Sequence, residues 1–219
     1  MKRVLLLFIL QLFFLTMYSQ VYKLYNTKNY HNQLRLNTMT GEVQQIQDDG
    51  QSWQICSARE VFGDKSGRFS LYETKNMWTF IMLDTYSGRT WQVQYSVKGE
   101  EYMFAEPINL YYLAIPDQNS NWSNRFQLFA TKNTWTFILL DSYNGRLWQV
   151  QYSTDSFDYL LCIPINDVEL VTNERRSVFS IQPLVSMYQY YLINESNGDM
   201  WKFQWSTKGD DYRWIERFK

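Results

Sequence analysis

The chain has 219 residues, which is enough for one large domain or two small ones. Aromatic residues make up 18% of it, charged residues only 20%, and there are 9 glycines and 4 prolines. This composition excludes disordered, collagen-like and low-complexity chains. It favours β-strands, in which aromatic side chains are enriched.

The N-terminus has the layout of a secretory signal peptide. A basic head, Met1 to Arg3, precedes an apolar run from Val4 to Leu15 that only Gln11 interrupts, and Ser19 follows shortly after. We predict that residues 1–19 are a signal peptide and that the protein is exported to the periplasm, the cell surface or the medium. An uncleaved anchor is the alternative, but the run is shorter than the roughly 20 residues that span a bilayer. No stable membrane span is therefore expected.

Charge and cysteine content limit the kinds of partner and metal that the chain is expected to bind. Removing residues 1–19 would remove two of the 21 basic residues and none of the 22 acidic ones. The mature chain would be weakly acidic, so nucleic acid is not an expected partner. Cys56, Cys162 and the single histidine, His31, cannot supply the four ligands of a typical zinc site. We expect neither a metal nor a cofactor, and the sequence leaves open whether the two cysteines pair.

One unit occurs four times in the chain. Residues 68–109 and 125–166 align without a gap, residues 178–219 keep the same skeleton, and a fainter copy spans about residues 21–61. The copies follow one another closely, so we expect residues 20–219 to form a single domain of four repeats.

Each repeat contains an Asx residue followed four positions later by glycine. The Asx side chain can cap its own backbone, and glycine accepts the positive φ that closes a short hairpin loop. A calcium loop would need several more carboxylates. We therefore assign structural turns to the pairs Asp84 and Gly88, Asp141 and Gly145, and Asn194 and Gly198, with Asn37 and Gly41 in the first repeat.

A glutamine also recurs in all four repeats, as Gln47, Gln94, Gln151 and Gln204. In the middle repeats it lies in the segment Trp-Gln-Val-Gln-Tyr, which alternates apolar and polar residues as a strand does. Hydrogen bonding of the glutamine row to neighbouring backbone is favoured over a sugar-binding face, because buried amides need partners.

The remaining pattern predicts four short antiparallel strands in each repeat. One strand ends in Thr-Lys-Asn, an apolar strand follows at 77–83 and 134–140, the glutamine strand comes next, and a fourth strand is expected at 102–108, 159–165 and 212–218. Four-stranded units of this size are typical of propeller blades.

Two resemblances support this interpretation. The hairpin that runs through Asp84 and Gly88 to Trp91 resembles the repeats of WD-type and quinoprotein-type β-propellers, which implies a fold and no active site. The repeats also resemble small exported bacterial repeat proteins of uncharacterised function with an LLDTxTGRxWQVQ element, which implies export.

We therefore predict an all-β fold of four antiparallel four-stranded repeats, arranged as a small four-bladed β-propeller. If 102–108 is the innermost strand of the next blade, the first repeat lacks such a strand. The C-terminal strand, 211–218, would then complete the first blade and close the ring, which removes open edges. A β-sandwich or an open stack of repeated hairpins is the alternative.

Candidate binding residues lie in the turns, where binding residues are usual. The Thr-Lys-Asn turns should share one rim with the Lys-Gly-acid turns, and the Asx-to-Gly turns should share the other rim with the connections 109–124 and 166–177. The candidates are Tyr111, Tyr112 and Trp122 in the first connection, and Lys75, Asn76, Lys132 and Asn133 in the Thr-Lys-Asn turns. The three aromatic residues could equally fold back as a cover.

Catalysis finds little support in the sequence. His31 stands where other repeats have Trp78, Trp135 and Tyr188, and no serine or cysteine lies in a nucleophile motif. We predict an exported, non-catalytic binding module whose partner is a protein or a glycan. The alternatives are a carbohydrate-active enzyme that uses carboxylates on the rim of Glu100 and Asp210, and a structural subunit of an envelope assembly.

Overall fold

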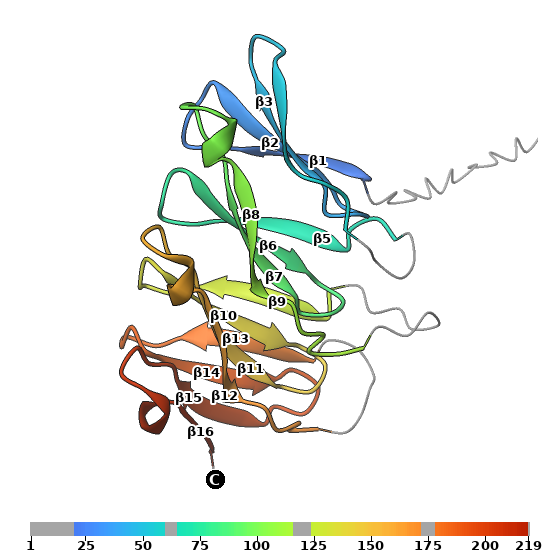
Figure 1. Ribbon diagram of the computed structural model, residues 1–219. Helices are drawn as coiled ribbons and strands as arrows, with labels where there is room; N and C mark the ends of the chain where they lie inside the picture. Colours follow the sequence, from blue (N-terminus) through green and yellow to red (C-terminus); the bar gives the residue numbers. More distant parts are fainter. Residues whose placement is uncertain (1–19, 60–64, 116–123, 172–177, 219) are drawn as a thin grey trace, which may run out of the picture.

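A computed structural model describes residues 20–59, 65–115, 124–171 and 178–218. The predicted signal peptide, residues 1–19, lies outside this part. The described strands form four antiparallel four-stranded sheets, each from one repeat, and Figure 1 shows them stacked in chain order from the first (blue) to the fourth (red). The predicted all-β fold of four propeller-like blades is therefore confirmed.

Every sheet is a simple meander of consecutive strands. The first sheet contains β1 (Tyr22–Asn26), β2 (Asn32–Asn37), β3 (Val43–Gln47) and β4 (Ser52–Cys56). The second contains β5 (Phe69–Glu73), β6 (Thr79–Asp84), β7 (Thr90–Gln94) and β8 (Phe104–Asn109). The third contains β9 (Phe126–Ala130), β10 (Thr136–Asp141), β11 (Leu147–Gln151) and β12 (Leu161–Asn166). The fourth contains β13 (Phe179–Pro183), β14 (Gln189–Asn194), β15 (Met200–Gln204) and β16 (Trp214–Arg217).

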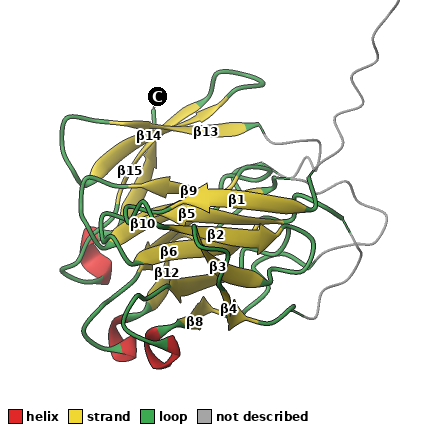
Figure 2. Ribbon diagram, turned by 90° about the horizontal axis from the view of Figure 1, so that it is seen from above, coloured by secondary structure: helices red, strands yellow, loops and turns green. Residues whose placement is uncertain are grey.

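A one-turn 3-10 helix precedes the last strand of the second, third and fourth sheets. These helices are η1 (Glu100–Tyr102), η2 (Phe157–Tyr159) and η3 (Asp210–Tyr212). Figure 2 shows them in red at one side of the molecule. We call this side, with the Thr-Lys-Asn turns, the helical rim, and the side of the Asx-to-Gly turns the connection rim.

The predicted closure of the ring by the C-terminal strand is wrong. β16 pairs with β15 inside the fourth sheet, and the first sheet has its own fourth strand, β4. Sequence alone hides β4 because a tight turn before it replaces the longer loop and the 3-10 helix of the later repeats. The main contacts between described sheets join consecutive repeats. The blades thus form an open stack, as in the alternative of stacked hairpins.

The first sheet ends the stack with a polar outer face. Its Gln33, Arg35 and Gln44 stand at the positions of Phe80, Met82 and Trp91 in the second sheet. Within this face, Arg35 donates a hydrogen bond to Gln44. Terminal repeats of stacked proteins need such a face, because no neighbour covers them.

The cores lie between sheets. Three clusters of buried side chains fill the three interfaces between consecutive described sheets. Every residue of β6 and of β10 is buried, because these strands are covered on both faces. Each of these clusters contains a pair of aromatic rings in contact. The pairs are Phe69 and Trp91, Phe126 and Trp148, and Phe179 and Trp201.

The Asx-to-Gly turns support this packing from the connection rim. Gly88 has a φ of 77°, and a Cβ on it would lie 2.9 Å from the ring of Phe126 in the next sheet. The same contact recurs between Gly41 and Phe69 and between Gly145 and Phe179. Gly198, at the open end, has a φ of 76° and nothing within 4 Å of such a Cβ. The inner glycines thus serve both the turn and the interface.

The Asx residue of the second repeat is a buried carboxylate. Asp84 accepts a hydrogen bond from the backbone N–H of Tyr86, and its carboxylate lies 2.8 Å from the guanidinium of Arg68 and 3.2 Å from that of Arg89. Burial by itself would raise the pKa of the Asp84 carboxyl. The hydrogen bonds and charge of Arg68, with a hydrogen bond from Ser87, outweigh burial and lower this pKa below its usual value. The third repeat copies this arrangement with Asp141, Arg125 and Arg146.

Replacing Asp84 by asparagine should destabilise the protein. The change removes the charge that compensates the buried Arg68 guanidinium, which typically costs about 3–5 kcal/mol. Because the folded-state pKa of Asp84 is lowered, its contribution is present above the unfolded pKa of about 4 and is lost as pH falls through the folded value. In urea denaturation, the stability difference between Asp84→Asn and wild type should therefore be full at pH 7 and shrink below about pH 4. An equal difference at both pH values would contradict the role given to Asp84.

Gly88→Ala and Gly198→Ala form a matched pair. Both place a side chain at a positive φ, which costs roughly 1–2 kcal/mol for a non-glycine residue. Only Gly88→Ala also drives a methyl group into the ring of Phe126. Thermal denaturation should therefore show a clearly larger loss for Gly88→Ala. Equal losses would mean that the glycine serves the turn alone.

Candidate functional site

Paired glutamine and serine residues clamp each sheet to the next near the helical rim. Gln92 donates to the carbonyl of Ser153 at 2.7 Å and accepts from its N–H at 3.1 Å. Gln45 makes the same two bonds with Ser96, at 2.9 and 3.1 Å. Gln149 accepts from the N–H of Ser206 at 3.1 Å. Each clamp fixes the loop after one glutamine strand against the preceding sheet.

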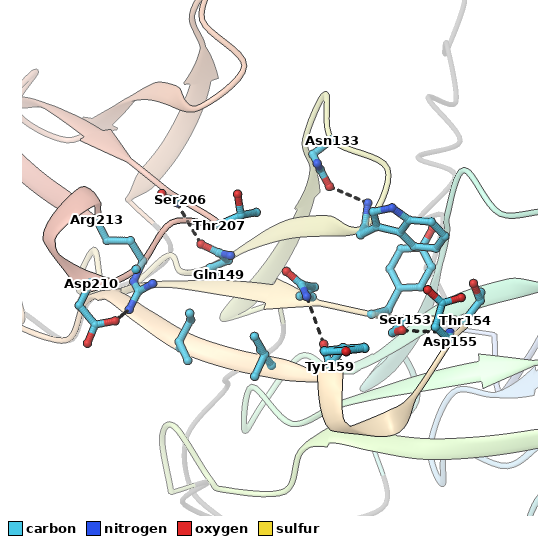
Figure 3. A pocket seen from close by; sticks show the side chains of 16 residues that line it. Asn133, Gln149, Ser153, Thr154, Asp155, Tyr159, Ser206, Thr207, Asp210 and Arg213 are labelled. Atoms are coloured by element: carbon cyan, nitrogen blue, oxygen red, sulfur yellow. Dashed lines mark hydrogen bonds and ion pairs between the residues drawn. The ribbon is translucent and has the colours of Figure 1, made fainter.

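The last of these clamps lies in a cleft between the third and fourth sheets (Figure 3). The cleft has a volume of about 530 Å³, within the range of small-molecule sites. On one side it is lined by β11, β12 and the loop 153–155, and on the other by the segment 206–213 that contains η3. Figure 3 shows Thr154 and Asp155 at one end and Asp210 and Arg213 at the other.

Two exposed aromatic rings belong to this cleft. Trp135 is 39% exposed and Tyr159 is 57% exposed, although both side chains are large and apolar. Trp135 is held in place, since its ring lies 5.2 Å from that of Tyr152 and its backbone N–H donates to the Asn133 side chain at 2.8 Å. A fixed, exposed indole is suited to stack on a ligand.

Polar groups surround the rings. The Gln151 side chain donates to the carbonyl of Tyr159 at 3.2 Å, which anchors the end of η2 beside the cleft. Arg213 forms an ion pair with Asp210 and donates to the carbonyl of Pro164 at 3.2 Å. The amide, hydroxyl and charged groups of the lining thus offer both hydrogen-bond donors and acceptors.

The acidic side chains of the cleft are exposed. Asp155 is exposed and the Asp210 side chain is 92% exposed, whereas a catalytic general acid usually sits in an apolar pocket that raises its pKa. In the described part of the chain, no group of three His, Cys, Asp or Glu residues could hold a metal ion. The cleft can stack and hydrogen-bond a ligand.

The two candidate lysines, Lys75 and Lys132, are used within the fold, as is Lys28 at the equivalent position of the first repeat. Lys28 donates to the carbonyl of Thr74 at 2.9 Å, Lys75 to that of Lys132, and Lys132 to that of Val185 at 2.8 Å. Each ammonium group therefore ties one repeat to the next.

Of the two asparagines in these turns, one belongs to the cleft. Asn76 accepts from the N–H of Trp78 at 2.8 Å and holds its own turn. Asn133 does the same for Trp135 and also lines the cleft.

The aromatic candidates of the first connection lie on the other rim. The N–H of Leu113 donates to the carbonyl of Ser87 at 2.8 Å, which places this segment beside the Asx-to-Gly turn. Tyr111 is 82% exposed, and Tyr112 lies over the guanidinium of Arg89 at 4.5 Å. Trp122 is outside the described residues. The structure thus keeps Tyr111 and Tyr112 apart from the cleft.

His31, Cys56 and Cys162 do not line the cleft. His31 and Asp48 form a pair at 2.6 Å, where the other repeats stack two rings, as in Trp135 and Tyr152. Cys56 and Cys162 are free thiols that lie against different interfaces. Burial raises the pKa of the Cys162 thiol to about 12, so this thiol is protonated at neutral pH.

Sequence reasoning missed most of the cleft, although signals for it were present. A glutamine recurs at equivalent positions of three repeats, as Gln45, Gln92 and Gln149, and a serine recurs as Ser96, Ser153 and Ser206. The recurrence of both residues in the sequence was therefore a signal for the clamp. Trp135 and Tyr159 also recur, with Trp78 and Tyr102 one repeat earlier. Recurrence alone does not separate a packed ring from a ring whose outer face is exposed.

No family model and no curated protein matches the chain. Among solved structures, an auxiliary nutrient binding protein from Bacteroides thetaiotaomicron VPI-5482 is similar, with a TM-score of 0.45 and 8% identity over 89% of this chain and 46% of that one. A protein from Lactobacillus plantarum is similar with a TM-score of 0.44 and 11% identity over 86% of this chain and 53% of that one. The chain thus spans about half the length of these two proteins. No helix in the described residues is long and apolar enough to cross a membrane.

Replacing Gln149 by alanine should loosen the cleft. The N–H of Ser206 loses its acceptor, and an unsatisfied buried donor costs about 1–3 kcal/mol. Hydrogen exchange followed by NMR should show faster exchange at Ser206 and unchanged exchange at Ser153, which Gln92 still holds. Unchanged exchange at Ser206 would show that the clamp does not fix the wall of the cleft.

Proposed function

We propose that the protein is an exported, non-catalytic binding module that holds a glycan in the cleft between its third and fourth sheets. The cleft carries this proposal, because it combines exposed rings, Trp135 and Tyr159, with amide, hydroxyl and charged groups. A sugar ring has apolar C–H faces that stack on aromatic rings, and hydroxyl groups that need both donors and acceptors. Export rests on the signal peptide predicted at residues 1–19.

The size and shape of the cleft favour a glycan over a protein partner. A stable protein interface buries about 800 Å² on each side, whereas a concave cleft of about 530 Å³ suits a ligand of a few sugar units. A protein partner is the second candidate. The exposed side chains of Leu110, Tyr111 and Ile115 on the connection rim support it, since together they offer an apolar surface.

A carbohydrate-active enzyme is less well supported. Glu100 and Glu101 are exposed on η1 and do not line the cleft. Asp155 and Asp210 do line it, but they lie at its opposite ends, and Asp210 is paired with Arg213. Glycoside hydrolysis depends on two carboxyl groups that flank a single bond, roughly 5–10 Å apart.

Affinity electrophoresis in gels that contain xylan, mixed-linkage β-glucan, galactomannan or pullulan tests the proposal. Folded protein should be retarded by at least one of these neutral polysaccharides. Trp135→Ala should weaken that binding by about tenfold or more, since the variant loses a stacking surface worth at least ~1.4 kcal/mol.

Tyr30→Ala is the matched control. Tyr30 is 85% exposed in the first repeat and is absent from the lining of the cleft, so its removal should leave retardation unchanged. If none of the gels retards folded protein, glycan binding is wrong. Equal weakening by both variants would place the glycan elsewhere.

A further inference from the structure

Two further pockets lie along the helical rim, and one of them adjoins the cleft. One lies between the second and third sheets and has a volume of about 330 Å³. It shares Ser153, Thr154 and Asp155 with the cleft. The other lies at the second sheet, has a volume of about 140 Å³, and shares Gln94 with the pocket beside it. Because neighbouring pockets have wall residues in common, they lie in a row along the helical rim, and we call this row across the second, third and fourth repeats the groove.

The groove is lined by equivalent positions of successive repeats. In the pocket between the second and third sheets, Gln94 and Phe104 face the loop of Ser153 and Thr154. The equivalent positions one repeat later are Gln151, Leu161, Ser206 and Thr207, and all four line the cleft. Since packed sheets lie roughly 10 Å apart, equivalent groups recur along the groove at about that spacing.

Exposed aromatic rings follow the groove. Tyr102, Phe157 and Tyr159 line it and are 49%, 51% and 57% exposed. Phe157 is held in position by an edge-to-face contact with Phe104, with ring centroids 5.1 Å apart. Stacking surfaces are therefore available in more than one repeat.

The charges of the groove cancel. Its charged lining residues are Lys98, Asp155, Asp210 and Arg213, two of each sign. A groove without net charge does not select a polyanion or a polycation, so acidic polysaccharides and nucleic acids are disfavoured. Its remaining groups are mainly amides, hydroxyls and aromatic rings.

We propose that the groove binds a linear neutral polysaccharide that runs along the helical rim from the cleft past the third repeat to the second. This inference rests on the proposed glycan binding. A regular polymer presents the same groups at a fixed interval, as the groove does. Each pocket that the chain reaches adds contacts without a new association event, so affinity should rise with chain length.

Calorimetric titration with oligosaccharide ladders, from disaccharides to hexasaccharides, of the polysaccharides used in the gels tests the inference. The hexasaccharide of a retained polysaccharide should bind at least about tenfold more tightly than its disaccharide. Phe157→Ala should remove most of this gain and leave the disaccharide affinity unchanged, because the disaccharide fits the cleft alone. Phe157 is half exposed, so the variant should fold, which an unchanged near-UV circular dichroism spectrum would verify.

The outcomes separate the two proposals. Binding that is independent of chain length and insensitive to Phe157→Ala would overturn the groove and leave the cleft as a site for a short glycan. Binding of none of the ladders would overturn both proposals.

Discussion

A four-stranded sheet cannot bury its own faces, and this constraint shapes the whole molecule. Both faces of the second and third sheets are covered only because a neighbouring sheet lies on each side, and the three buried clusters accordingly lie between repeats. The contacts that hold neighbours in register recur at each interface. Glutamine binds the serine backbone near the helical rim, and an aromatic ring rests on the turn glycine at the connection rim.

The way in which consecutive sheets are held together also shapes the candidate site. A loop that is clamped to the preceding sheet leaves a recess between itself and the last two strands of that sheet. The recess between the second and third sheets is lined by Gln94, Phe104 and the loop 153–157. One repeat later, Gln151, Leu161 and the segment 206–210 line a cleft that also includes Trp135 and Tyr159, whose equivalents in the second sheet line a separate pocket. Two recesses that are distinct in the earlier repeat are thus joined in the cleft of about 530 Å³.

The sequence could predict the parts of the structure that depend on local chemistry. The repeats, the strand order and the turns at Asp84 and Gly88 follow from patterns that are visible along the chain. The closing strand was predicted wrongly because β4 follows a tight turn that the other repeats lack, so its equivalence to β8 is hidden. The ion pairs around Asp84 were also hidden, because Arg68 recurs as Arg125 but recurrence does not show which carboxylate an arginine contacts.

The cleft was harder to predict for a different reason. Trp135 and Tyr152 both recur in the repeat, and their rings are in contact, yet Tyr152 is 1% exposed and Trp135 is 39% exposed. Only the three-dimensional stack shows which ring of a packed pair reaches the rim. Tyr111 and Tyr112 stood out because they lie outside the repeat, but their neighbours are the turn at Ser87 and the side chain of Arg89.

An NMR titration of labelled protein with a retained oligosaccharide shows directly whether the ligand site lies on the helical rim between sheets. Binding there should shift the Trp135 indole N–H and the backbone amides of Thr154, Asp155 and Thr207, and leave the amides of Tyr111 and Tyr112 unchanged. Shifts confined to the connection rim, at Tyr111 and Tyr112, would contradict this placement of the site.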